Sequence, residues 1–130
     1  AIMKTRNQNR LVTERLEQAL KDYPLYSQDS KKKDAICNTI MCIGNARWYI
    51  LEGQQEGNDF TFYGIVVGLT ATEYGYFSAN EMADITIDAS KYGLGHLQIE
   101  EKTGFHPCKL SSIEDEELQS FLSCLYDNNK

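Results

Sequence analysis

The sequence predicts an α+β fold: a mostly antiparallel sheet of about four to six strands, with N-terminal and C-terminal helices and one short internal helix. Two observations support this prediction. Apolar residues recur with a helical period at both ends of the chain, whereas the middle alternates short runs of β-forming residues with turn residues. Short connections between strands favour antiparallel pairing. The 130 residues suit a single globular domain, which we place over residues 1–130.

The first predicted element is a helix over residues 9–23. Its buried stripe consists of apolar residues at helical spacing: Val12, Leu16, Ala19, Leu20 and Tyr23. Pro24 ends the helix because proline lacks the backbone N–H that would continue it. We expect residues 24–35 to form a polar linker that is mobile, since it is long for a connection inside a compact domain.

Residues 36–110 form the predicted sheet region. A run rich in β-forming residues over 36–43 is followed by Gly44 and Asn45, a two-residue hairpin signal, and the chain returns as a second strand over 47–52. The third strand, over 60–68, is almost continuously apolar in its middle, which is typical of a central strand covered on both faces.

The stretch "ATEYGYFSANEM", residues 71–82, predicts a strand that turns directly into a short helix. Residues 74–77 can form the strand. Ser78 and Glu81 then match the S-x-x-E capping box, in which the serine hydroxyl accepts from the Glu81 N–H and the glutamate reaches back to the Ser78 N–H. We expect the helix to end near residue 84 or 85.

The last part of the chain predicts one or two further strands and a helix. A strand over 96–101 follows a glycine-containing loop, and Pro107 restricts any later strand to an edge of the sheet. The C-terminal helix covers residues 112–127, with Ser111 or Ser112 as its cap. Its predicted buried stripe consists of Leu118, Phe121, Leu122 and Leu125.

Composition excludes several kinds of function. The net charge of −6 makes nucleic-acid binding unlikely as a function, because that binding needs basic side chains against phosphates. No apolar stretch is long enough to span a membrane and no signal-peptide pattern occurs, so we expect a cytoplasmic protein. The four cysteines form no CxxC motif and the two histidines are not at ligand spacing, so we expect no metal site. Each cysteine lies among apolar residues, which predicts reduced, mostly buried thiols, and we expect no cofactor.

Sequence motifs of the common nucleotide-binding and hydrolase sites are absent, which leaves three hypotheses about function. A non-enzymatic binding protein is the first. A small enzyme could instead use a carboxylate pair drawn from Glu73, Glu100 and Glu101 near Trp48. The third hypothesis is an acidic inhibitor that mimics DNA, which requires the carboxylates of residues 114–117 to line up with others in a band.

One spaced set of residues resembles a known bacterial family. The pattern W-x-x-x-E, F-x-G, E-x-G-Y-x-S-x-x-E, G-L and I-E-x-x-x-x-F-x-P-x-x-L spans roughly residues 36–110, and its most specific part runs from Glu73 to Glu81. This pattern is similar to that of the uncharacterised family called domain of unknown function 2958. The chain lacks four features of that family: a lysine in the first strand, an aspartate after the F-G pair, a proline before the glutamate, and an arginine–aspartate pair after the late I-E.

The resemblance implies a bacterial protein of the kind carried by plasmids and other mobile elements, and it implies no particular activity. Together with the absent catalytic motifs, it predicts a small binding or accessory protein of a mobile genetic element, with a protein partner whose identity is unknown. The residues that we expect to contribute to binding are Trp48, Glu73, Tyr76 and Glu100.

Overall fold

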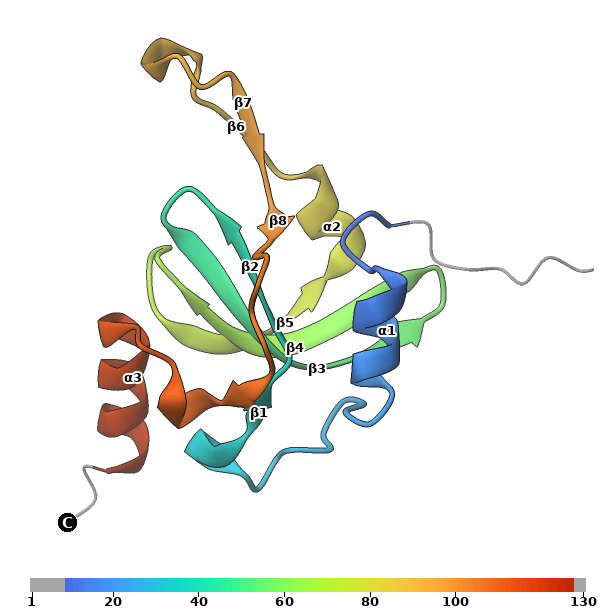
Figure 1. Cartoon of the computed structure of the whole chain (residues 1–130), viewed down its shortest axis with the longest axis vertical. Coiled ribbons are helices and arrows are strands. Elements are labelled where there is room, and N and C mark those ends of the chain that lie inside the picture. The colour runs from blue at the N-terminus through green and yellow to red at the C-terminus, as the bar shows by residue number, and fades with distance from the viewer. Residues whose placement is uncertain (1–8, 128–130) are drawn as a thin grey trace, which may run out of the picture.

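The computed structural model describes residues 9–127, and within this range the fold is α+β (Figure 1). The body is a five-stranded antiparallel sheet with the strand order β5-β4-β3-β2-β8. Its strands are β2 (Thr39–Ile43), β3 (Ala46–Glu56), β4 (Asp59–Val67), β5 (Glu73–Ser78) and β8 (Glu100–Glu101). The predicted antiparallel sheet is confirmed, and so is the hairpin turn at Gly44 and Asn45, because Ile43 pairs with Ala46.

Both faces of this sheet are covered by helices. The helices are α1 (Glu14–Leu20), α2 (Ala79–Asp84) and α3 (Glu116–Tyr126). Side chains of α1 and α2 pack with Trp48 and Phe62 in one core cluster, and side chains of α3 pack with Tyr49 and Ile65 in a second. Neighbouring residues of a strand point to opposite faces, so the side chains of Trp48 and Tyr49 on β3 pack in different clusters. Figure 1 shows α1 and α3 on opposite sides of the sheet.

Two short strand pairs lie outside the five-stranded sheet. β1 (Ile36–Cys37) pairs with β9 (Cys108–Lys109), and β6 (Thr86–Asp88) pairs with β7 (His96–Gln98). Three short 3₁₀ turns complete the described chain: η1 (Lys32–Asp34), η2 (Ser90–Tyr92) and η3 (Leu110–Ser112). Figure 1 shows β6 and β7 as a hairpin that projects away from the body, and we call residues 85–98 the arm.

The N-terminal helix is shorter than the predicted span of 9–23. Asn9 first folds the chain into a turn, because its side chain accepts the Leu11 N–H at 2.7 Å and its carbonyl accepts the Val12 N–H at 3.1 Å. Thr13 then caps α1 by accepting the Leu16 N–H at 3.2 Å. Polar side chains thus hold residues 9–12 in a turn that competes with a first helical turn.

Residues 24–35 are packed against the sheet, which contradicts the expectation of a mobile polar linker. The Glu52 carboxylate, only 1% exposed, accepts the backbone N–H of Tyr26 at 2.7 Å and that of Gln28 at 2.8 Å. The side-chain amide of the buried Gln28 in turn donates to the Ile36 carbonyl and accepts the Ile36 N–H. A bulge in β3 beside Leu51 places Glu52 where it can make these bonds.

The strand–helix joint at residues 71–82 forms as predicted. Ser78 ends β5 and its hydroxyl accepts the Glu81 N–H at 3.1 Å, which confirms the cap. The second half of the capping box differs. Asp59 accepts both the Ser78 hydroxyl and, at 3.0 Å, the Asn80 N–H. Asp59 on the neighbouring strand therefore completes the cap in place of Glu81.

The C-terminal helix begins later than the predicted residue 112. Asp115 is its cap and accepts the N–H groups of Glu117 at 3.0 Å and Leu118 at 3.2 Å, so neither predicted serine has that role. Leu118 and Leu122 are buried as predicted and Phe121 is partly buried against the same cluster, whereas Leu125 is 46% exposed.

Candidate binding surface

The structure removes Trp48 from the predicted binding residues. Its side chain is 4% exposed and packs in the core cluster beneath α1 and α2. A buried indole in a fully apolar cluster stabilises the fold and cannot contact a partner. The prediction for Trp48 is therefore wrong, and the reason is that β3 is the middle strand of a sheet with two covered faces.

Glu73 lies apart from the other two predicted carboxylates. Glu73 begins β5 at one edge of the sheet, whereas Glu100 and Glu101 form β8 at the opposite edge. Glu100 and Glu73 are both exposed, and the Glu101 carboxylate bonds Arg15 and the Thr39 hydroxyl. No pair that includes Glu73 is assembled, so the acid–base arrangement that the enzyme hypothesis needs at Glu73 is not formed.

Tyr76 lies at the open end of a row of aromatic side chains. Its ring is 53% exposed, with its centroid 4.8 Å from that of Tyr63 and 6.2 Å from that of Tyr26. The row continues through Tyr74, which stacks on Tyr63 at 5.7 Å and whose hydroxyl lies 2.7 Å from that of Tyr126. A hydrogen bond with Tyr26 raises the pKa of Tyr76 to about 12, so this hydroxyl stays protonated at neutral pH. Tyr76 remains a surface candidate.

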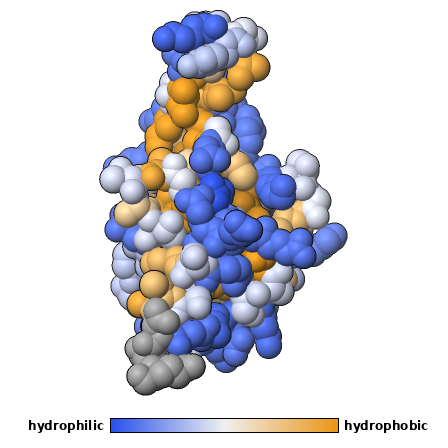
Figure 2. Space-filling view, turned by 90° about the vertical axis from the view of Figure 1, so that its left-hand side faces the viewer, coloured by the Kyte–Doolittle hydropathy of each residue, from blue (hydrophilic) through white to orange (hydrophobic). Residues whose placement is uncertain are grey.

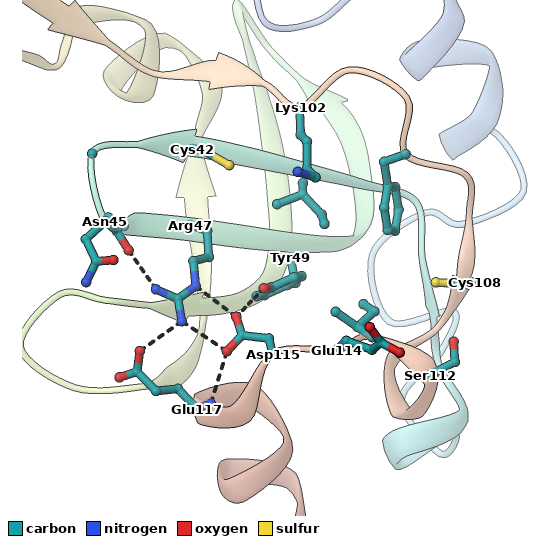
Figure 3. A pocket seen from close by; sticks show the side chains of 15 residues that line it. Cys42, Asn45, Arg47, Tyr49, Lys102, Cys108, Ser112, Glu114, Asp115 and Glu117 are labelled. Carbon is teal, nitrogen blue, oxygen red and sulfur yellow. Dashed lines mark hydrogen bonds and ion pairs between the residues drawn. The ribbon is translucent and has the colours of Figure 1, made fainter.

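A cavity of about 730 Å³ opens between the β2–β3 hairpin, the segment 102–108 and the start of α3 (Figure 3). Its charged and thiol-bearing lining residues are Cys42, Arg47, Lys102, Cys108, Glu114, Asp115 and Glu117. Sequence reasoning did not single out this cavity, because its walls come from segments that are far apart along the chain.

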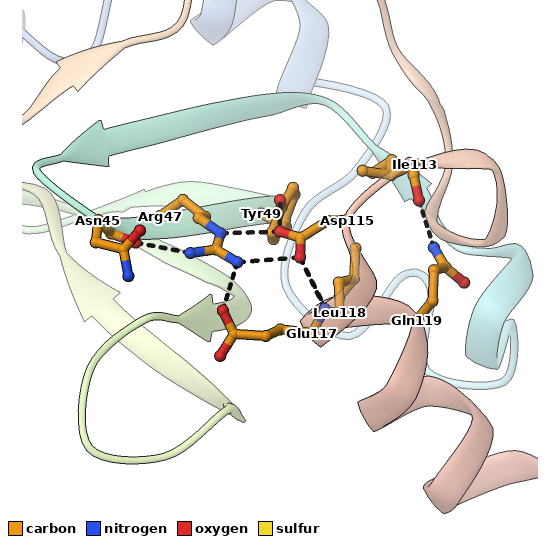
Figure 4. Close-up of polar contacts among 8 residues, drawn as sticks. All are labelled: Asn45, Arg47, Tyr49, Ile113, Asp115, Glu117, Leu118 and Gln119. Carbon is orange, nitrogen blue, oxygen red and sulfur yellow. Dashed lines mark hydrogen bonds and ion pairs between the residues drawn. The ribbon is translucent and has the colours of Figure 1, made fainter.

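Arg47 and Asp115 form the most connected polar network of the cavity (Figure 4). The guanidinium donates to Asp115 at 2.8 and 3.0 Å, to Glu117 at 2.8 Å and to the Asn45 carbonyl at 2.7 Å. The Tyr49 hydroxyl donates to the same Asp115 carboxylate. This network ties the cap of α3 to β3, so its first role is to hold the helix on the sheet.

The protonation states of this network do not suit acid–base chemistry at neutral pH. The Arg47 guanidinium holds the pKa of Asp115 at about 2, well below its usual range. Burial, followed by the hydrogen bond to Asp115, raises the pKa of Tyr49. At neutral pH, Asp115 is thus fixed as a carboxylate and Tyr49 as a phenol, and neither is poised to exchange a proton. Asp115 and Glu117 also pair with Arg47, so residues 114–117 do not form the band of free carboxylates that a DNA mimic needs.

The arm carries the largest group of exposed apolar side chains outside the sheet body. Ile85 and Ile87 are 41% and 43% exposed, Leu94 is 62% exposed and Tyr92 is 75% exposed. Figure 2 shows apolar side chains gathered along the arm, above a body surface that is mainly hydrophilic. The sequence signal is the set of apolar residues among glycines in "ITIDASKYGLGHL", a stretch whose pattern predicts only a loop and a strand.

The arm is held firmly at its base and tip. Arg10 donates to the Ile99 carbonyl at 2.6 Å and to the Ala83 carbonyl at 3.2 Å, so one side chain binds the chain just before and just after the arm. Ile99 itself is fully buried in the core. At the tip, the Ala89 N–H donates to the Gly95 carbonyl at 2.7 Å. The arm is therefore a built element with a defined direction.

No protein-family model, curated protein or solved structure matches this chain. Within residues 9–127, no helix is long and apolar enough to span a membrane, and no group of three or more histidine, cysteine or acidic side chains could hold a metal ion.

Proposed function

We propose that this chain is a non-enzymatic binding protein that holds a protein partner with its arm. The observation that carries the proposal is the exposure of four large apolar side chains on a hairpin that projects from the body. A two-stranded hairpin is marginally stable in water by itself, and exposed apolar groups of this size mark interaction sites.

The composition of the arm favours a protein as the partner. Only Asp88 and Lys91 are charged among residues 85–98, although charged residues make up 25% of the whole chain. The central part of a protein–protein interface is depleted in charged residues and enriched in aromatic ones such as Tyr92. A nucleic acid or an anionic membrane would instead select an excess of lysine and arginine. We therefore expect a partner that offers an apolar groove to the arm.

The attachment of the arm supports the same function. Because Arg10 fixes both chain segments at its base, the apolar side chains are presented in one direction before the partner arrives. A surface that is ordered in advance loses less conformational entropy on binding and binds more tightly.

The resemblance of the stretch from Glu73 to Glu81 suggests the biological setting. We propose a bacterial accessory protein of a mobile genetic element, acting in the cytoplasm. Tyr76 is a second exposed position on the body, on the face of β5 opposite to that of Glu73.

Photo-crosslinking tests the proposal at the residue that is most exposed. The variant Tyr92→benzoylphenylalanine is irradiated in an extract of the host bacterium, and Leu69→benzoylphenylalanine is the matched control, since Leu69 is 58% exposed in a loop of the body. We expect one defined protein adduct from position 92 and none from position 69. Excess wild-type protein should compete the adduct away, and excess Leu94→Ala should compete at least tenfold less well, as expected for a residue at the centre of an interface.

Three outcomes would overturn the proposal. They are the absence of an adduct at position 92, an adduct that Leu94→Ala competes away as well as wild type does, and an adduct with a second copy of this chain. Sedimentation with anionic phospholipid vesicles provides the remaining test: binding to vesicles that Leu94→Ala abolishes would assign the arm to a membrane surface and also contradict the proposal.

A further inference from the structure

Two cysteines that are distant in the sequence face each other across a strand pair. β1 and β9 are antiparallel, and Cys37 is paired directly with Cys108. The Leu110 N–H donates to the Ala35 carbonyl at 2.9 Å, two residues along the same ladder, so Cys37 and Cys108 also occupy a hydrogen-bonded position. The Cα atoms of such a pair lie about 5.5 Å apart, inside the range of about 4.4–6.8 Å in which a disulfide can form.

The two thiols have different surroundings. Cys108 is half-buried and lines the 730 Å³ cavity, so a small solute can reach it from solvent. Cys37 is fully buried in the core cluster under α3, where its thiol donates weakly to the Thr39 carbonyl at 3.4 Å. Cys108 is thus accessible to a reagent, and the buried Cys37 lies next to it on the paired strand.

We infer that Cys37 and Cys108 are an oxidation site that forms a disulfide when the protein meets a peroxide. In the first step the Cys108 thiol takes one oxygen atom from hydrogen peroxide, which gives a sulfenic acid and one water molecule. In the second step the Cys37 sulfur attacks the Cys108 sulfur, the S–O bond breaks, and the thiol proton and hydroxide leave as a second water molecule. The peroxide is the two-electron oxidant and is fully reduced to water.

The surroundings of Cys37 set the rate of the second step. Burial, and then the neighbouring Cys108, raise the pKa of the Cys37 thiol, and the thiolate is the attacking form. The disulfide should therefore form slowly at neutral pH and faster as the pH rises. Once formed, it would join β1 covalently to β9, the strand that leads from the cavity wall into η3.

Peptide mapping after oxidation tests the inference, provided that the variant used allows Cys37 to be distinguished from Cys42. Lys33 and Arg47 bound a tryptic peptide that contains both Cys37 and Cys42, so wild-type maps cannot tell these two residues apart. The parent is therefore the double variant Cys42→Ser, Cys124→Ser, treated with hydrogen peroxide and then alkylated. We expect the intact protein to be lighter by two hydrogens, with a linked pair formed by the peptides 34–47 and 103–109.

Two variants make the test decisive. Cys108→Ser in the double variant should lose the bridge, and Cys37→Ala should lose it as well; alanine is chosen because a serine hydroxyl would be buried at that position. The wild type should lose two titratable thiols, with Cys42 and Cys124 still alkylated. A bridge from Cys108 to Cys42, a dimer joined through Cys124, or oxidation of Cys108 to a sulfinic acid with Cys37 still free would each overturn the inference.

The thermal stability of the oxidised protein gives an independent check. A bridge between directly paired strands closes a long loop in the unfolded chain, so oxidation should raise the melting temperature of the double variant and reduction should reverse the change. The same treatment should leave the melting temperature of the Cys108→Ser derivative unchanged. An oxidised double variant that melts no higher than its reduced form would contradict the predicted geometry.

Discussion

The sheet body and the arm contain the same kinds of apolar side chain and expose them very differently. Leu118 on α3 is fully buried, whereas Leu94 in the arm is 62% exposed. The body has a layer of helices on each face of its sheet, and the arm has two strands with no layer against them. Apolar character alone therefore does not bury a residue; a second layer must be available to cover it.

This difference separates two uses of apolar surface. In the body, burial provides most of the free energy of folding, and each large side chain contributes on the order of 2 kcal/mol. In the arm, the same surface contributes little to folding while it remains exposed, and it can contribute to binding when a partner covers it. Substitutions in the two regions should therefore differ in their effect on the free energy of unfolding.

The largest effect is expected for Leu118→Ala in the second core cluster. Leu118 is fully buried between α3 and the sheet, and truncation leaves a cavity that the close-packed neighbours fill only in part. We expect a loss of about 3–4 kcal/mol in the free energy of unfolding, measured by urea denaturation. A loss below about 1 kcal/mol would mean that α3 is not packed on the sheet as described.

Glu52→Ala is expected to lower the free energy of unfolding slightly less than Leu118→Ala does. The substitution leaves the backbone N–H groups of Tyr26 and Gln28 without their acceptor in a buried region, at a cost of about 2–3 kcal/mol. Glu52→Gln is the control, since it keeps the volume and one acceptor oxygen, and it should lose about half as much. If Glu52→Ala unfolds like the wild type in urea, residues 24–35 do not depend on this carboxylate.

Part of this architecture could be predicted because its signals are local. The Gly44–Asn45 hairpin, the apolar middle of β4 and the Ser78 cap each depend on residues within a few positions of one another. Local turn and capping chemistry acts before tertiary contacts form, so sequence patterns report it directly.

The remaining features depend on contacts between distant parts of the chain. Asp115 caps α3 because Arg47, 68 positions away, fixes its carboxylate, and the predicted serine caps lacked that support. The packing of residues 24–35 depends on a bulge in β3, and the exposure of the arm depends on the lack of a covering layer. Trp48 was misassigned for the same reason, since its burial requires helices on that face of the sheet.

The Asp115 network predicts how stability depends on pH. The pKa of Asp115 is held at about 2 in the folded protein and starts from an ordinary value of 3.8, so the unfolded chain binds the proton more tightly. The Asp115 carboxylate therefore contributes about 2 kcal/mol to the free energy of unfolding above pH 4, and this contribution is lost as the pH falls through about 4 to 2. Asp115→Asn should flatten that part of the curve of unfolding free energy against pH. An unchanged curve would show that the pair with Arg47 does not form.

Ser78→Ala is expected to have a moderate effect. It removes the acceptor of the Glu81 N–H at the start of α2 and should cost about 1 kcal/mol, or a fall of a few degrees in melting temperature. Glu81→Gln should change the melting temperature by much less, because Asp59 rather than Glu81 completes this cap. Equal losses from the two substitutions would restore the reciprocal capping box that the sequence predicted.

The smallest effect is expected for Leu94→Ala in the arm. Leu94 is 62% exposed, so its truncation should change the free energy of unfolding by less than about 0.5 kcal/mol. Leu97→Ala is the matched control three residues further along the same arm. Leu97 is half-buried against the core cluster under α1 and α2, and its truncation should cost roughly 1–2 kcal/mol, less than at a fully buried site.

The two leucine variants should be compared in one series of urea titrations. A loss at Leu97 without a loss at Leu94 means that the arm contributes to folding only where it joins the body. The remaining apolar surface of the arm would then be maintained for a reason other than stability. If Leu94→Ala were instead as destabilising as Leu97→Ala, the exposed side chains would serve the fold. The distinction between body and arm would fail, and the proposed binding role would lose its main support.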